Sequence, residues 1–175
     1  MLVARQQMER LMRSFSRLVI IGFAGLALAA PISAQRSDDQ IAPKSVDLQR
    51  QGKALLGAGK LEQAEDALET ALAVDPRNRW AFVDLARVAE KQHLFGKAIR
   101  MTNKALMLEP NDPDAIAVQG EAMVEMGATA RAQANLQKLQ SICVKGCPQI
   151  AMLSAAISRG PTVAAATTPD TTKKN

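Results

Sequence analysis

Apolar and small residues recur between residues 45 and 142 with two periods: a short one typical of amphipathic helices, and a long one of about 34 residues. Ala64, Ala98 and Ala132 mark the long period. Five further columns follow it, one of small residues and four of mostly apolar ones. Their members are Gly52, Ala86 and Gly120; Leu48, Phe82 and Ile116; Leu55, Ala89 and Met123; Leu68, Thr102 and Leu136; and Ala71, Ala105 and Leu139. We expect three similar units of two helices each, with Pro76 and Pro110 closing the first two.

Gly and Pro residues interrupt the apolar pattern and place the ends of the helices. The six helices expected in the three units are Val46–Ala58 and Leu61–Val74, Trp80–Gln92 and Phe95–Leu108, and residues 113 to about 126 and Ala128–Ile142. Asp112 followed by Pro113 is typical of a capped helix start. A seventh helix is expected at Pro148–Ser158, where one apolar face would cover the open end of the third unit.

These columns resemble the tetratricopeptide repeat (TPR). Its repeating unit has a large and then a small residue in the first helix, with Ala, a large residue and a closing Pro in the second. The resemblance covers residues 45–142. The third unit departs from it at its end, with Leu139 in an Ala column and Val144 where Pro is expected. The resemblance implies an all-α, TPR-type helical-hairpin solenoid of three repeats plus a C-terminal capping helix.

The segments outside the repeats have different compositions. Residues 1–34 are typical of an export signal, because Arg residues precede the apolar stretch Leu18–Ala30 and small residues lead up to Ala34. The alternative is an uncleaved membrane anchor, although a span needs about 20 mostly apolar residues. We expect a signal peptide at 1–34, a flexible linker at 35–44, the TPR domain with its capping helix at 45–158 and a disordered tail at 159–175.

Charge and composition exclude several function classes. From residue 35 onward the chain has 18 basic and 16 acidic side chains, a balance that gives no basic stripe for nucleic acid. His93 is the only histidine and lies in an expected turn. One histidine is too few for a convincing zinc site or for His-based nucleophilic catalysis. We expect no catalytic residue, metal or cofactor.

Cys143 and Cys147 are the only cysteines. In an exported chain such a pair predicts a disulfide, which here would join the third unit to the capping helix. The alternative is a redox-active thiol pair. The three-residue spacing between the cysteines differs from the two-residue spacing of thioredoxin-like motifs and disfavours that alternative.

The concave face is the expected binding site, since the first helix of each TPR unit lines it. By this resemblance the groove for a partner holds Gln49, Lys53, Trp80, Val83, Arg87, Lys91, Ala117, Glu121 and Glu125. Arg87 and Lys91 are basic, and Glu121 and Glu125 occupy the same slots in the next repeat. These charges either meet the partner or form an inter-helix salt-bridge ladder, worth about 0–1 kcal/mol per exposed pair. Trp80 either contacts the partner or packs on the preceding loop.

The resemblance implies a non-enzymatic module that binds a protein or peptide segment. The N-terminal segment predicts that it works in a bacterial periplasm, within a periplasmic or envelope assembly, or is held at the inner membrane if that segment is not cleaved. TPR domains that clamp a C-terminal carboxylate use basic residues in their first and third units. Glu121 and Glu125 disfavour that clamp here. Two alternatives remain: a self-associating, homo-oligomeric scaffold, and a thiol–disulfide protein that uses the cysteine pair.

Overall fold

The computed structural model of the chain describes residues 40–162, which form seven α-helices and no strand. The helices are α2 (Pro43–Gly57), α3 (Leu61–Val74), α4 (Arg79–Lys91), α5 (Phe95–Leu108), α6 (Pro113–Glu125), α7 (Thr129–Ile142) and α8 (Pro148–Arg159). Within residues 40–162 no helix is both long and apolar enough to cross a membrane. The signal peptide predicted at residues 1–34 and nearly all of the predicted tail lie outside the described residues.

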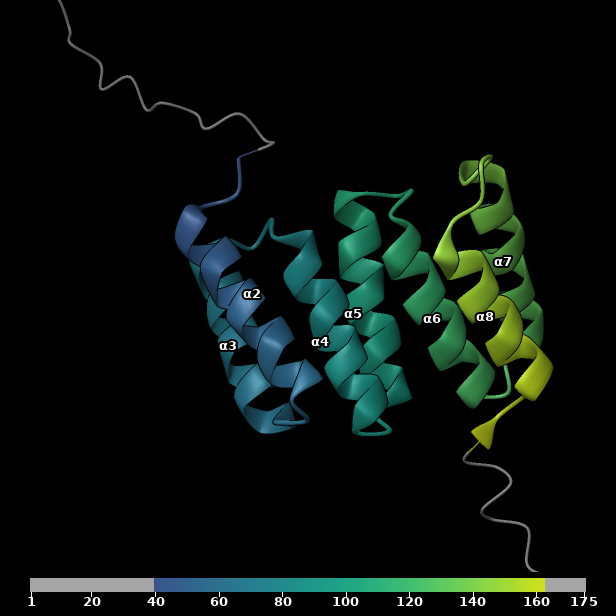
Figure 1. The fold of residues 1–175 in the computed structure, drawn as a ribbon, viewed down its shortest axis with the longest axis horizontal. Coiled ribbons are helices and arrows are strands. Elements are labelled where there is room, and N and C mark those ends of the chain that lie inside the picture. The colour runs from purple at the N-terminus through teal and green to yellow at the C-terminus, as the bar shows by residue number, and fades with distance from the viewer. Residues whose placement is uncertain (1–39, 163–175) are drawn as a thin grey trace, which may run out of the picture. The chain divides into compact units, whose positions relative to one another are not determined.

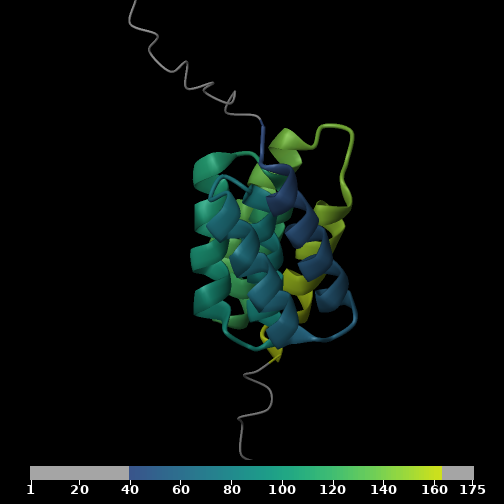
Figure 2. The same ribbon diagram turned by 90° about the vertical axis from the view of Figure 1, so that its left-hand side faces the viewer.

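The helices pair in chain order and the pairs stack. Each of α2, α4 and α6 packs against the helix that follows it, and α3 and α5 each pack against the first helix of the next pair (Figure 1). The first helices also contact one another, α2 with α4 and α4 with α6. Seen along the stack, α2 and α8 lie on one side and the second helices on the other (Figure 2). Because α8 packs on both α6 and α7, it takes the place of the first helix of a fourth pair.

Short-range signals set the helix ends. Asn78 and Asp112 occupy equivalent positions of successive repeats. Their side chains accept hydrogen bonds from backbone N–H groups in the first turns of α4 and α6. The turn inside each pair contains one residue with positive φ: Gly59 at 72°, His93 at 59° and Gly127 at 73°. These three residues also follow the repeat period, so the second unit uses a histidine where the others use glycine.

Small residues allow close helix packing, as the columns predict. Ala64, Ala98 and Ala132 have no exposed surface. A Cβ on Gly52 would lie 2.5 Å from Leu68 Cγ of the paired helix α3. A Cβ on Gly120 would lie 2.6 Å from Leu153 Cδ1 of α8. The glycine of the third unit therefore admits the capping helix, whereas the column predicts close approach only within helix pairs.

The first helix begins at Pro43, three residues before its predicted start. Asp75 Oδ2 accepts the backbone N–H of Ala42 at 2.9 Å and so fixes the approach to the helix. Ser45 is fully buried, donates from Oγ to the carbonyl of Ala71 at 2.7 Å and accepts from Nδ2 of Asn78 at 2.9 Å. These contacts bridge the first two pairs and belong to no local pattern. The remaining helix bounds agree with the predictions to within one residue.

Candidate binding groove

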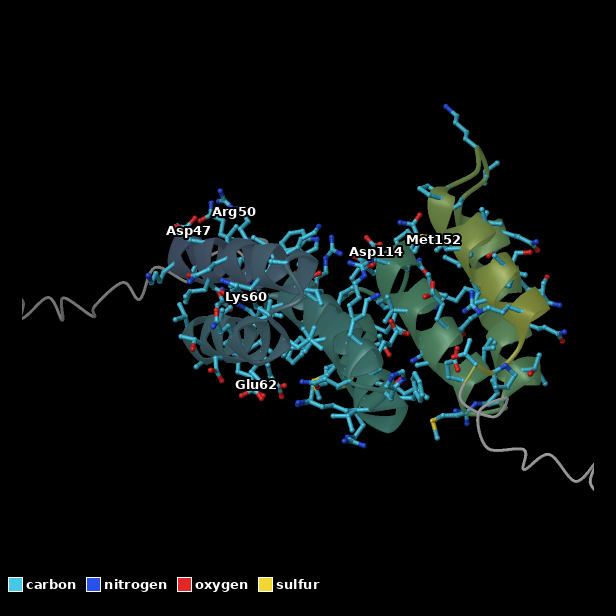
Figure 3. All side chains as sticks on the ribbon, turned by 60° about the horizontal axis from the view of Figure 1, so that its bottom comes forward. Asp47, Arg50, Lys60, Glu62, Asp114 and Met152 are labelled. Atoms are coloured by element: carbon cyan, nitrogen blue, oxygen red, sulfur yellow. A yellow bond between two sulfur atoms is a disulfide. The ribbon has the colours of Figure 1, made fainter. Side chains whose placement is uncertain are left out.

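An open cavity of about 910 Å³ lies along the first helices, toward their C-terminal ends. Its lining combines apolar and charged side chains from α2, α4, α6 and α8 with the turns beside them and the first residues of α3 and α5. The lining residues are Leu56, Gly57, Gly59, Leu61, Arg87, Glu90, Lys91, His93, Phe95, Val118, Glu121, Glu125, Met152, Arg159 and Thr162. We call this set the binding groove. In Figure 3, Met152 and Asp114 lie on the same side as Asp47 and Arg50 of α2, and Glu62 of α3 lies on the opposite side.

A continuous polar ladder joins the four first helices beside the groove. Gln49 of α2 donates from Nε2 to Asp84 Oδ2 of α4 at 2.5 Å. Arg87 donates from Nη1 to Asp84 Oδ1 at 3.3 Å and from Nη2 to Asp114 Oδ1 of α6 at 2.7 Å. Gln149 of α8 donates to the same oxygen of Asp114 at 3.1 Å. The side chain of Arg87 is therefore committed to two carboxylates of the fold.

The two carboxylates of the ladder have different environments. Burial raises the pKa of Asp84 above its ordinary value, although Gln49 and Arg87 hydrogen-bond to the carboxylate. Burial also acts on Asp114, but the hydrogen bond from Gln149 and the charge of Arg87 hold its pKa below the ordinary value. The ladder thus keeps Asp114 ionised and reduces the cost of burying Asp84.

Two further carboxylates line the groove without an ion pair to another described residue, although the charges of Arg87 and Lys91 act on both. Burial, with repulsion from Glu121, raises the pKa of Glu90 to about 8. Burial also raises the pKa of Glu121. Glu121 Oε1 is buried and accepts no hydrogen bond from the described residues. Neither residue has an ion pair within residues 40–162.

The C-terminal end of the groove is closed by contacts to Glu125. Thr162 donates to Glu125 Oε2 from its backbone N–H and its hydroxyl, each at 2.8 Å. Arg159 of α8 places Nη2 3.9 Å from Glu125 Oε1. Lys91 is exposed and forms no ion pair with another described residue. The groove therefore has one satisfied acid at its end and two unmatched acids further inside.

Four of the nine residues predicted to line a groove lie together in this cavity: Arg87, Lys91, Glu121 and Glu125. The other five, Gln49, Lys53, Trp80, Val83 and Ala117, lie outside its lining. Gln49, Val83 and Ala117 are buried in the fold. Trp80 is 44% exposed, and the guanidinium carbon Cζ of Arg79 lies 4.3 Å from the centroid of its ring. Partner contacts by any of the nine remain a prediction.

The sequence leaves a salt-bridge ladder open as one reading of Arg87, Lys91, Glu121 and Glu125. No ion pair joins these four within residues 40–162, and Arg87 pairs with Asp84 and Asp114 instead. The sequence also does not predict that Glu90 and Met152 line the groove. Glu90 follows Arg87 by three positions on the same helix face, a spacing that could have identified it. Met152 lies on α8, to which the sequence assigns only a capping role.

The cysteine pair lies away from the groove. Cys143 caps the end of α7 and Cys147 precedes α8, with their Cα atoms 5.7 Å apart and the side chains joined as a disulfide. Across the described part of the chain, no three His, Cys, Asp or Glu side chains are grouped so that they could hold a metal ion. The structure thus places these cysteines at the joint between the third pair and the capping helix.

Comparison with known proteins identifies the architecture. A tetratricopeptide repeat family model matches residues 55–120. The Sgt2 TPR domain from Aspergillus fumigatus is similar over 80% of this chain and 93% of its own, with a TM-score of 0.63 and 19% identity. The TPR2B domain of yeast Sti1 in its pHsp70 complex is similar over 67% of this chain and 98% of its own (TM-score 0.62, 20% identity).

A third solved structure, the first TPR of Spaghetti (RPAP3) bound to the HSP90 peptide SRMEEVD, is similar over 66% of this chain and 94% of its own, with a TM-score of 0.58 and 19% identity. No curated protein is detectably similar in sequence. The repeat match and the structural likeness support the TPR family, and the chain has the all-α TPR fold that its sequence predicts.

Proposed function

We propose that this TPR chain is a non-enzymatic interaction module that holds a segment of another protein in its binding groove. The observation that carries the proposal is the 910 Å³ open cavity on the first-helix face, which combines apolar walls with two acids that form no ion pair among the described residues. Concave sites with a few polar groups among apolar ones are the usual form of binding pockets. TPR folds are generally protein-interaction folds, and stacked repeats commonly use such extended concave surfaces.

The structural neighbours support this class of function. The first TPR of Spaghetti (RPAP3) is bound to an HSP90 peptide, and the TPR2B domain of Sti1 is in complex with pHsp70. The peptide SRMEEVD ends in acidic residues. In the present chain Glu90, Glu121 and Glu125 line the groove; of its three cations, Arg87 is held by the ladder, Arg159 faces Glu125 and Lys91 is exposed. We therefore propose that the partner segment of this chain is not acidic.

We also propose that the module works after export, in the envelope of a bacterium, where it joins proteins of an assembly. Residues 1–34 support this through their basic start, apolar stretch and small residues before residue 35. The pairing of Cys143 with Cys147 is compatible with an oxidising compartment. Fusion of residues 1–34 to a reporter active only outside the cytoplasm tests this placement, and a silent fusion that is well expressed contradicts it.

Peptide selection tests the groove directly. A random peptide library is selected against the immobilised full chain, and the affinity of the enriched peptides is measured by fluorescence anisotropy. Met152→Glu puts a charge on an apolar groove wall at a residue that is 49% exposed, so the fold should tolerate it. We expect affinity to fall about tenfold or more, as for a hot-spot contact.

Met107→Glu is the matched control. Met107 is 83% exposed on α5 and does not line the groove. Its substitution makes the same chemical change on another face. Equal affinity of both variants for the selected peptides would place binding elsewhere, and the absence of any enriched peptide would contradict an interaction module of this kind.

A further inference from the structure

The binding groove has a defined chemical pattern. Leu56 of α2 and Met152 of α8 supply partly exposed apolar surface, and the buried Val118 of α6 also lines the cavity. Glu90 of α4 and Glu121 of α6 line the same cavity and are close enough that Glu121 raises the pKa of Glu90. An apolar channel with a pair of acids on neighbouring helices is complementary to an aliphatic chain that ends in a positive charge.

The cations near these acids are already engaged or exposed to solvent. Arg87 binds Asp84 and Asp114. Arg159 lies 3.9 Å from Glu125, which also accepts two hydrogen bonds from Thr162. Lys91 is exposed at the rim of the groove. Among the described residues, Glu90 and Glu121 are therefore the acids of the groove that form no ion pair, although the charges of Arg87 and Lys91 act on both from beyond ion-pair distance.

Burial makes this arrangement costly for the free chain. Burial and repulsion from Glu121 raise the pKa of Glu90 to about 8, so Glu90 ionises only at a cost, and the buried Oε1 of Glu121 has no donor among the described residues. A cation placed between the two carboxylates would remove both costs at once. A neutral donor can satisfy Oε1 of Glu121, but only a positive charge also favours the ionised form of Glu90, so a basic segment gains more in this groove than a neutral or acidic one.

The geometry points to a partner segment that carries a lysine or arginine flanked by apolar residues, with the cationic end received by Glu90 and Glu121. The aliphatic stem of that side chain packs along the apolar wall formed by Leu56, Val118 and Met152. This inference rests on the proposed function, since it names the chemistry of the segment that the groove holds. Lys91 at the rim disfavours a second positive charge nearby and so favours a single basic residue.

The experiment uses matched peptides from the selection described above. For an enriched peptide with a basic residue, the lysine or arginine is replaced by glutamine or by glutamate, and each peptide is titrated against the full chain. We expect affinity to fall about tenfold with glutamine, as for loss of a charge-assisted hydrogen bond, and further with glutamate. Glu121→Gln in the chain should weaken the basic peptide by a similar factor and leave the glutamine peptide unchanged.

A charge exchange provides the sharper arm of the test. Glu121→Lys should weaken the basic peptide and strengthen the peptide that carries glutamate in its place. The matched control is Glu62→Lys, because Glu62 is exposed on α3 on the opposite side of the stack. The melting temperature of each variant shows that it is folded. Recovery of binding by the exchanged pair cannot arise from a general loss of stability.

The outcomes separate this inference from the proposed function. Peptides that bind, respond to Met152→Glu and show no preference for a basic residue overturn the inference and leave the interaction module standing. No binding by any peptide overturns both. If binding appears only after deletion of residues 163–175, the groove holds the chain's own tail, and the inference of a foreign segment is wrong.

Discussion

Arg87 of α4 and Asp114 of α6 are joined across two repeats by a 2.7 Å hydrogen bond from Nη2 to Oδ1. The same guanidinium donates to Asp84, whose side chain is only 4% exposed. Arg87 therefore supplies the charge that permits a buried carboxylate in the middle of the stack. Its place among the groove-lining residues is secondary to this structural role.

Substitution of Arg87 by methionine should destabilise the fold. The change leaves Asp84 buried without its cation, and we expect a loss of about 1–3 kcal/mol in the free energy of unfolding. Lys91→Met is the control, since Lys91 is exposed and unpaired within the described residues, and should change stability by less than about 0.5 kcal/mol. Urea unfolding followed by circular dichroism measures both. Equal effects would contradict a structural role for Arg87.

The period of the sequence predicts which helices form and how they pair, because one spacing repeated three times fixes the apolar and small faces together. It does not predict the partners of long polar side chains. Equivalent slots in successive repeats suggest Glu121 for Arg87, but the residue that Arg87 reaches, Asp114, lies earlier in α6 than that slot. Helical side chains point toward the N-terminus of their helix, so Arg87 reaches back to Asp84 and to the start of α6.

The groove could be predicted only in part for a related reason. Its wall includes Met152 of α8, and α8 becomes a wall because Leu153 fits over Gly120. The repeat columns end before α8. They therefore do not predict that the capping helix lies on the same side as the first helices. Likewise, the raised pKa of Glu90 depends on burial by neighbouring helices, and the local sequence carries no signal for it.

Addition of a methyl group at Gly120 should test the joint between the third pair and α8. A Cβ there would lie within 2.6–2.7 Å of two Leu153 methyl carbons, which must move. We expect Gly120→Ala to cost about 1–3 kcal/mol, the usual range for overpacking. Gly57→Ala is the control, because a Cβ at Gly57 meets nothing within 4 Å and should stabilise the helix by up to about 1 kcal/mol. Thermal unfolding compares the two, and a neutral Gly120→Ala would contradict close packing.

The pH dependence of stability should reveal Glu90. Its folded pKa of about 8 lies above the ordinary value of 4.5, so the folded state loses stability relative to the unfolded state as pH rises through this range. Glu90→Gln removes that loss. We expect the variant to match the wild type near pH 4 and to exceed it by roughly 2–4 kcal/mol above pH 8.

Unfolding by urea at pH 4, 6 and 9 measures the effect of Glu90→Gln. Glu62→Gln, on the exposed side of α3, serves as the control and should give a constant difference from the wild type. A constant difference for Glu90→Gln as well would show that this carboxyl ionises normally. The experiment also reports on the charge state of the groove before a ligand enters.

The turn of the second pair should respond to the identity of residue 93. His93 has φ of 59°, a conformation that costs an L-residue roughly 1 kcal/mol or more, while Gly59 and Gly127 adopt it freely in the equivalent turns. We expect His93→Gly to raise the free energy of unfolding by up to about 1 kcal/mol, partly offset by loss of the ring contact with Phe95. His93→Val should lower it by about 1 kcal/mol or more. The opposite order of the two variants would contradict this backbone assignment.

The cysteine pair should act as a structural link between α7 and α8. The bond spans a sequence separation of 4, and closure of so short a loop contributes about 2 kcal/mol by the chain-entropy argument. Cys143→Ser should therefore lower the melting temperature, and added reductant should lower that of the wild type toward the same value. Val144→Ser, in the same loop at a residue 88% exposed, controls for the substitution itself and should change the melting temperature little.

Because the disulfide lies outside the groove lining, selected peptides should bind folded Cys143→Ser with unchanged affinity. If Cys143→Ser is as stable as the wild type but has lost its biological activity, a thiol–disulfide function is favoured instead. A purely structural disulfide affects activity only by stabilising the fold.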